Sequence, residues 1–171
     1  MSVNVPRGFV FSNVLDRILQ HWNEIKGDRV APKRSDLRPQ NFPSYLGYMQ
    51  LVDVDGESFR YRLVGNKLVD AFGSNFTGKT VDELFSAQKA AFFNNLYAEI
   101  RDRRRPLRMQ CDYNAGQGLF FSSDRIYCPI SQDGENTTTI WGVLTFNSLR
   151  PLAGEWSHAN VDALSVRKYF L

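Results

Sequence analysis

The sequence predicts an α+β domain built on one antiparallel β-sheet. Three observations indicate this fold: a β-hairpin pattern at residues 48–63, helical patterns between residues 66 and 104, and strand-like runs between residues 107 and 149. Hairpins on both sides of a helical crossover exclude a doubly wound parallel sheet, in which strands and helices alternate throughout. We therefore expect a five-stranded antiparallel sheet with the helical crossover on one face and an N-terminal amphipathic helix outside the core.

A long amphipathic helix is predicted near the N-terminus, from Ser12, a good N-cap, to Gly27, a good C-terminal stop. Its apolar residues recur at helical spacing and form a wide stripe that contains Phe11, Val14, Leu15, Ile18, Leu19, Trp22 and Ile25. The stripe needs a cover, which is either the outer face of the sheet or the same stripe of a second chain. Its candidate residues for a homodimer or partner interface are Phe11, Leu15, Ile18 and Trp22.

The chain divides into three parts by its sequence pattern: a helix and connector at residues 1–41, the main domain at residues 42–150 and a tail at residues 151–171. The connector is polar and contains Pro32, Pro39 and Pro43, which predict extended chain or short turns. The pattern predicts no definite element for the tail.

The main domain contains the predicted strands and crossover helices. Strand-like runs occur at residues 48–54, 59–63, 107–113, 119–130 and 138–149, and helical patterns at residues 66–72, 81–85 and 87–104. Asp55 and Gly56 predict a tight turn between the first two strands. Thr80 and Glu83 form a capping-box pattern for the second helix, and Pro106 follows the end of the third.

Alternate residues of each strand point to the same face of a sheet. We assign one such set to the face that packs against the crossover helices, namely Phe59, Tyr61, Leu63, Met109, Cys111, Tyr113, Ile126, Cys128 and Ile130. The two cysteines lie in apolar runs and are not spaced as a redox or metal motif, so they are expected to be small core residues.

This order of elements resembles the PAS domain family over residues 42–149. The resemblance is carried by Phe59-Arg-Tyr-Arg-Leu-Val-Gly65, which runs into a short helix, and by Gly73-Ser-Asn-Phe-Thr-Gly-Lys-Thr80 before the next helix. The segment Pro32-Lys-Arg-Ser-Asp-Leu-Arg-Pro39, followed by Tyr45-Leu46, further resembles bacterial PAS proteins that often occur as single-domain chains.

The resemblance implies a sensory and interaction module. In this family the space between the sheet and the long helix can hold a small ligand, and an N-terminal helix outside the core often builds a dimer. The ligand-binding candidates here are Tyr61, Leu63, Phe72, Phe92, Leu96, Tyr113, Ile126 and Trp141. A packed aromatic core accounts for the same residues without any ligand, because burial of each aromatic side chain contributes about 2 to 3 kcal/mol.

The cofactor stays unidentified, but two cofactor types of the family are disfavoured. Flavin photosensors carry a reactive cysteine after the short helices, where this chain reads Ser74-Asn-Phe-Thr-Gly-Lys79. Haem sensors commonly take an axial histidine from the long helix, whereas the two histidines here are His21 and His158. We therefore expect neither a flavin–cysteine adduct nor histidine-ligated haem, although other haem ligands stay open.

A competing interpretation comes from residues 73–80, which match the phosphate-binding pattern GxxxxGK[ST]. In a nucleotide-binding enzyme, Gly78, Lys79 and Thr80 would hold phosphates and Mg²⁺. That chemistry needs a buried strand before the loop and a long helix after it. Residues 66–72 have a helical pattern and the following helix is short, so this alternative is disfavoured.

Charge and hydropathy restrict the classes of partner and the cellular location that we expect. The 21 Lys and Arg residues and 18 Asp and Glu residues leave a net charge of +3, which by itself points to neither nucleic acid nor a membrane surface. The basic run at residues 101–105 could contact a polyanion or an acidic partner, but it ends a helix, where cations interact favourably with the helix dipole. No apolar run approaches the roughly 18 residues that cross a bilayer, and the N-terminus lacks a secretory signal pattern. We therefore expect a cytoplasmic protein.

The sequence supports no catalytic or metal site. Neither histidine is accompanied by a nucleophile and an orienting carboxylate, and no group of Cys, His and acidic residues has ligand spacing. We expect a non-catalytic PAS module of bacterial signal transduction. Within 171 residues we find no kinase, cyclase or DNA-binding pattern, so its output is expected to be contact with a separate signalling protein.

Overall fold

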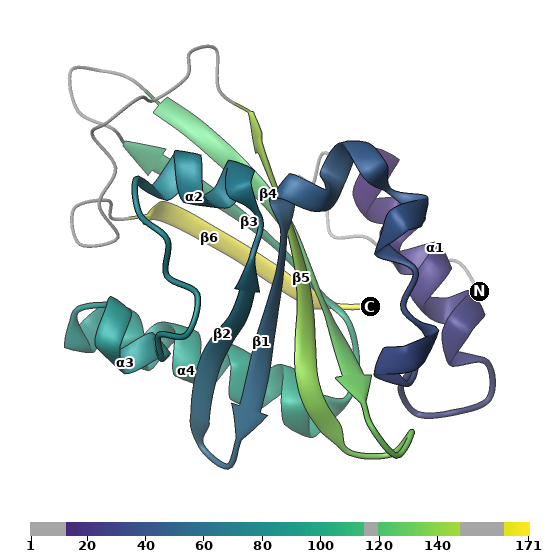
Figure 1. Cartoon of the computed structure of the whole chain (residues 1–171). Helices are drawn as coiled ribbons and strands as arrows, with labels where there is room; N and C mark the ends of the chain where they lie inside the picture. Colours follow the sequence, from purple (N-terminus) through teal and green to yellow (C-terminus); the bar gives the residue numbers. More distant parts are fainter. Residues whose placement is uncertain (1–12, 115–119, 148–162) are drawn as a thin grey trace.

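The central element is a six-stranded antiparallel sheet with the strand order β2-β1-β5-β4-β3-β6 (Figure 1). The computed structural model describes residues 13–114, 120–147 and 163–171. The long helix α4 lies against one face of the sheet, and α1 with its connector lies against the other. The α+β class is confirmed, whereas the expected strand number of five is corrected to six within these described ranges.

The strands are β1 (Met49–Asp55), β2 (Ser58–Val64), β3 (Leu107–Asn114), β4 (Phe120–Ser131), β5 (Thr137–Asn147) and β6 (Ala163–Phe170). The helices are α1 (Asn13–Lys26), α2 (Asn66–Phe72), α3 (Val81–Leu84) and α4 (Ala87–Arg103). The connector contains the 3₁₀ turns η1 (Arg34–Asp36), η2 (Pro39–Asn41) and η3 (Pro43–Tyr48). The proline-rich connector therefore forms short turns, as its composition predicts.

Local sequence signals explain where the crossover helices begin and end. The Thr80 hydroxyl accepts a hydrogen bond from the Glu83 amide, and the Glu83 carboxylate accepts one from the Thr80 amide, which completes the predicted capping box of α3. Gly73 ends α2 with a left-handed φ of 71°, a conformation that glycine adopts without steric cost. These short helices carry the chain from β2 to the start of α4.

The sheet separates two hydrophobic cores. We call the core between the sheet and α2–α4 the inner core; its fully buried residues include Phe59, Leu68, Leu96, Tyr97, Ile100, Leu107 and Met109. We call the core between the sheet and α1 the outer core; its buried residues include Val14, Leu15, Ile18, Trp22, Ile126, Cys128, Trp141 and Val143. Both faces of the central strands are thus removed from water.

The face assignment made for β4 is wrong for Ile126, Cys128 and Ile130, which lie in the outer core. Residues opposite each other in an antiparallel pair share a face, and the register sets Ile126 opposite Arg108 and Tyr127 opposite Leu107. Because both faces of β4 are buried, its apolar residues do not alternate with solvent-exposed ones. Alternation therefore could not identify which face meets the helices.

The face assignment of Leu63 is also wrong, because a β-bulge in β2 turns the Leu63 side chain to the opposite face of the sheet. Tyr61 pairs with Val52 and Leu63 pairs with Leu51, so Arg62 is an extra residue without a partner position. After the bulge Val64, rather than Leu63, packs against the inner core. The Leu63 side chain is 46% exposed.

Strand β6 lies in the tail, for which the sequence pattern predicts no element. It pairs antiparallel with β3 and forms the edge of the sheet opposite β2. Lys168 reaches Glu99 of α4 at 2.9 Å, and Phe170 packs against the inner core with the Arg103 guanidinium over its ring. The tail thus extends the sheet and fastens the C-terminal half of α4.

Candidate functional site

A chain of buried polar groups crosses the inner core. The Tyr97 hydroxyl of α4 lies 3.1 Å from the Tyr61 hydroxyl of β2 and accepts a hydrogen bond from the Gln50 amide of β1 at 3.3 Å. All three side chains are buried. Since buried polar groups are stabilised only when they are hydrogen-bonded, these contacts join α4 to both strands of the first hairpin.

Strand β4 adds a second polar group to the same face of the sheet. Arg125, which is 3% exposed, donates from Nε to the Ser123 hydroxyl at 2.7 Å and from a terminal nitrogen to the Tyr127 hydroxyl at 3.4 Å. The Tyr127 ring lies 5.8 Å from the Tyr97 ring, centroid to centroid. Arg125 and Tyr127 therefore extend the polar chain from α4 to strand β4, on the same face of the sheet.

Gly142 of β5 makes room for this arrangement. In the sheet it lies between Gln50 of β1 and Tyr127 of β4. A Cβ atom at this position would come within 2.9 Å of Gln50 Cγ and 3.0 Å of Tyr127 Cδ1. The missing side chain allows the polar residues of β1 and β4 to approach each other across the intervening strand.

The electrostatics keep the phenol groups neutral. Burial raises the pKa of the Tyr61, Tyr97 and Tyr127 hydroxyl groups, while the positive charge of Arg125 acts in the opposite direction on each. Protonated hydroxyl groups can donate as well as accept hydrogen bonds. Together with the Gln50 amide, they could bind a carbonyl, a ring nitrogen or a hydroxyl group of a small molecule.

Aromatic side chains surround these polar groups. Tyr61 packs edge-on against Phe76 with ring centroids 4.9 Å apart, and Phe59 packs against Tyr97 at 5.5 Å. Partly buried aromatic residues of α2 and of the α3–α4 region pack against the same core; they are Phe72, Phe85, Phe92 and Phe93. The inner core thus combines apolar surface with a few convergent polar groups, the composition typical of small-molecule sites.

The sheet divides the sequence-predicted ligand residues between its two faces. Tyr61 and Leu96 are buried in the inner core, and Phe72 and Phe92 pack against it. Ile126 and Trp141 lie in the outer core, which corrects their assignment to the same site, and Leu63 is exposed. For Tyr113 the structure describes the backbone, in β3, but not the side chain.

The polar members of the inner core were missed by sequence reasoning. Gln50, Arg125 and Ser123 have side chains that usually face water, so alternation patterns treat them as surface residues. Tyr97 is not among the ligand candidates named from the sequence. One signal could have identified Arg125: the strand from Phe120 to Ser131 has polar residues on both alternating sets, which a strand with one solvent-facing side would not show.

The predicted interface residues of α1 are buried within their own chain. Leu15 and Ile18 are fully buried, and the Trp22 indole donates to the Pro129 carbonyl oxygen at 2.8 Å. The sequence left two possibilities for this stripe, the sheet of the same chain or a second chain. In the structure the stripe packs against the sheet of the same chain. While α1 is docked here, a second chain cannot contact these three side chains; Phe11 lies outside the described residues.

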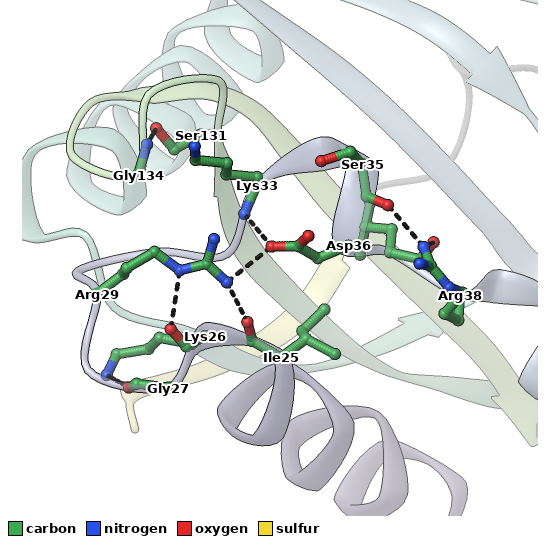
Figure 2. Close-up of polar contacts among 11 residues, drawn as sticks. Ile25, Lys26, Gly27, Arg29, Lys33, Ser35, Asp36, Arg38, Ser131 and Gly134 are labelled. Carbon is green, nitrogen blue, oxygen red and sulfur yellow. Dashed lines mark hydrogen bonds and ion pairs between the residues drawn. The ribbon is translucent and has the colours of Figure 1, made fainter.

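Polar contacts hold α1 at both ends. Near its start, Asp16 lies 2.9 Å from the guanidinium of Arg108, which also contacts Asp124 at 3.2 Å. At its end, Arg29 donates to the Lys26 and Ile25 carbonyl oxygens and pairs with Asp36 of η1 at 2.7 Å (Figure 2). This ion pair lowers the pKa of the Asp36 carboxyl. The helix is therefore tied to the sheet and to the connector.

Residues 73–80 do not have the geometry of a phosphate-binding loop. The loop follows helix α2 instead of a strand, and α3 after it has four residues. The amide of Gly78 donates to the Tyr61 carbonyl oxygen at 2.6 Å and that of Lys79 to the Phe76 carbonyl oxygen at 3.1 Å. The Thr80 amide binds Glu83, so these amides already have partners where phosphates would need them.

The arginine run at the end of α4 makes contacts within the fold. Arg101 pairs with Glu57 at 3.0 Å and donates to the Gly56 carbonyl oxygen at the β1–β2 turn. Arg105 donates to the Leu171 backbone oxygen at 2.8 Å, and Arg103 lies over the Phe170 ring. These contacts join α4 to the first hairpin and to β6, which accounts for the basic run without a polyanion.

Within the described ranges, no group of three or more Cys, His, Asp and Glu side chains could hold a metal ion. His21 lies in the outer core, and His158 lies outside the described residues. No helix of the described part of the chain is long and apolar enough to span a bilayer.

Comparison with known proteins identifies a family. Residues 10–145 match the family model described as a PAS domain. No curated protein matches the chain. The matched range starts before α1 and ends within β5, so it includes the connector, the crossover helices and every inner-core polar residue described above.

Proposed function

Since the chain belongs to the PAS domain family, we propose that it is a sensory and interaction module that binds a small molecule in the inner core. The observation that carries this proposal is the buried polar chain of Gln50, Tyr61 and Tyr97 inside an aromatic core. Apolar residues at such positions would stabilise the fold as well as these polar ones, because the cost of desolvation offsets most of the gain from a buried hydrogen bond. Convergent polar groups in this core therefore favour a binding role.

A ligand would change contacts that reach three elements. Tyr97 belongs to α4, Tyr61 to β2 and Gln50 to β1, so a molecule that replaces one of their mutual hydrogen bonds would alter how α4 lies on the sheet. Of the residues expected to line the site, Tyr61, Leu96, Phe72 and Phe92 stay in the proposal. The movement of α4 relative to the sheet would be the signal.

The output that we propose is protein contact without catalysis. The module would act in the bacterial cytoplasm, as a homodimer or on a separate signalling protein. Partner contact would use surfaces other than the docked stripe of α1, because Leu15, Ile18 and Trp22 are occupied by the sheet.

A native mass spectrum of freshly purified protein tests this function, after incubation with the low-molecular-mass filtrate of a cell extract. We expect a dimer with a reproducible added mass that disappears on denaturation. In the Tyr97→Phe variant, loss of a hydroxyl that contacts both Gln50 and Tyr61 should raise the dissociation constant about fivefold, since a hydrogen bond contributes about 1 kcal/mol, and should lower the occupancy when the ligand does not saturate the chain.

The matched control is Tyr48→Phe, which removes the same hydroxyl from a tyrosine of η3 that packs against Tyr45. This variant should keep the occupancy of the wild-type chain. A wild-type chain without added mass would contradict ligand binding. An equal loss of occupancy in both variants would mean that the ligand does not bind at Tyr97.

A further inference from the structure

His21 is a buried imidazole in the outer core, and the functions proposed above do not use it. Its side chain is 8% exposed and lies edge-on to the Phe42 and Trp141 rings, with centroid distances of 5.4 and 6.3 Å. Its Nε2 atom is buried without a hydrogen-bond partner in the described part of the chain. The neutral ring therefore packs as an aromatic group, and a charged ring would have a buried Nε2–H group without an acceptor.

The charged groups around His21 come from two elements. On α1 they are Arg17 and Glu24, which lie one helical turn away on either side. From the connector, Arg38 adds positive charge, and the Arg17 guanidinium lies 5.7 Å from the centroid of the Phe42 ring. The residue that packs on His21 from β5 is Trp141, which is uncharged.

We propose that His21 makes the docking of α1 sensitive to acid, so that protonation of its imidazole releases the helix from the outer face of the sheet. Leu15, Ile18 and Trp22 would then leave the outer core, and the surface under them would become accessible. This inference concerns the outer core alone and does not depend on ligand binding in the inner core.

The environment of the ring determines the direction in which docking depends on pH. Burial lowers the pKa of His21, Arg38 lowers it further, and Glu24 partly opposes them. In the released helix the ring would regain an ordinary pKa near 6.5. Docking is therefore fully stable above about pH 6.5 and weakens as the pH falls below that value, because the released state binds the proton more readily.

The two free cysteines provide a probe for each face. Cys128 lies in the outer core with α1, and Cys111 lies in the inner core with α4; both are buried. Labelling with a pyridyl disulfide is measured at pH 7.5 and 5.0, and each rate is divided by the rate in the unfolded chain at the same pH. This ratio removes the intrinsic effect of pH on the thiol.

In the wild-type chain the Cys128 ratio should rise at least threefold at pH 5.0, with an upper limit of about thirtyfold set by the proton equilibrium of a released histidine. The Cys111 ratio should stay unchanged. In the His21→Phe and His21→Gln variants, neither of which titrates in this range, the Cys128 ratio should be the same at both values of pH. A rise in these variants, or no rise in the wild type, would overturn the proposal.

Nuclear magnetic resonance titration of the wild-type chain gives a second measurement that needs no folded variant at position 21. The chain has two histidines, and a His158→Gln variant assigns their imidazole signals. His21 should titrate below pH 6.5. Titration at or above that value would overturn the proposal, as would an acid-induced rise of the Cys111 ratio equal to that of Cys128, which would mean that the whole fold opens.

Discussion

Two arginines on opposite faces of the sheet illustrate how single residues fix this fold. Arg108 of β3 points to the outer face, where it is 1% exposed and contacts Asp124 and Asp16. Arg125 of β4 points to the inner face, towards Ser123 and Tyr127. Alternation places Arg108 correctly, because Met109 and Cys111 of the same strand were assigned to the helix-facing side and do lie in the inner core. It misplaces Arg125, because Ile126, Cys128 and Ile130 were assigned to that side and lie in the outer core.

Replacement of Arg108 tests how much the buried ion pair between Arg108 and Asp124 stabilises the fold. Arg108→Met removes one member of a buried ion pair and leaves the Asp124 carboxylate in the outer core, so we expect a loss of about 3 to 5 kcal/mol in the free energy of unfolding. The measurement is urea denaturation at neutral pH. Asp16→Asn serves as the control, because this partner is half exposed and should contribute about 1 kcal/mol or less.

If Arg108→Met unfolds with the same midpoint as the wild-type chain, Arg108 does not stabilise the folded state through Asp124. The double variant Arg108→Met, Asp124→Leu separates the charge from the packing. It should recover part of the loss, because the Asp124 carboxylate no longer lies in the core without the guanidinium of Arg108.

At the scale of elements, helix α1 is part of the fold of its own chain. Its amphipathic pattern predicts the helix and its stripe correctly, yet an apolar stripe packs equally well on a sheet of the same chain or on a second chain. The sheet decides between these two partners, because strands β4 and β5 place Ile126, Trp141 and Val143 on the outer face, where α1 packs against them. Those residues were expected elsewhere or had no assigned face, so the docking could not be predicted.

The Leu15→Ala substitution tests the docking of α1. Leu15 is fully buried in the outer core, so its truncation should lower the free energy of unfolding by about 2 to 5 kcal/mol. Gln20→Ala on the exposed side of the same helix should change it by less than about 0.5 kcal/mol. Urea denaturation and light scattering after size-exclusion chromatography are measured together.

A Leu15→Ala chain of wild-type stability that changes only from dimer to monomer would contradict the docked helix. That result would assign the stripe to an interface between chains.

At the scale of the whole molecule, the sheet separates a polar, aromatic inner core from an outer core that holds α1. The order of strands and crossover helices was predictable because hairpin, cap and stop signals are local. The bulge at Arg62 and the edge strand β6 depend on pairing with distant strands. The family match also ends at residue 145, before β6 begins.

The candidate site was predictable only in part for the same reason. Tyr61, Leu96, Phe72 and Phe92 are apolar or aromatic residues at expected core positions, and they do pack in one core. Gln50 joins them because the strand register sets it beside Tyr127 across Gly142, and Arg125 joins them because it donates to the Tyr127 hydroxyl; no local pattern encodes this register. A sequence pattern can thus indicate the aromatic part of this core but not its polar part.

Ligand mapping on methyl-labelled protein tests the central claim most directly. The low-molecular-mass filtrate of a cell extract is titrated into the chain while carbon–proton spectra of the methyl groups are recorded. The account predicts shifts for inner-core methyl groups such as those of Leu68, Leu96 and Ile100, and unchanged signals for Leu15, Ile18 and Ile126 of the outer core. Shifts centred on the outer core, or no shift in either core, would contradict it.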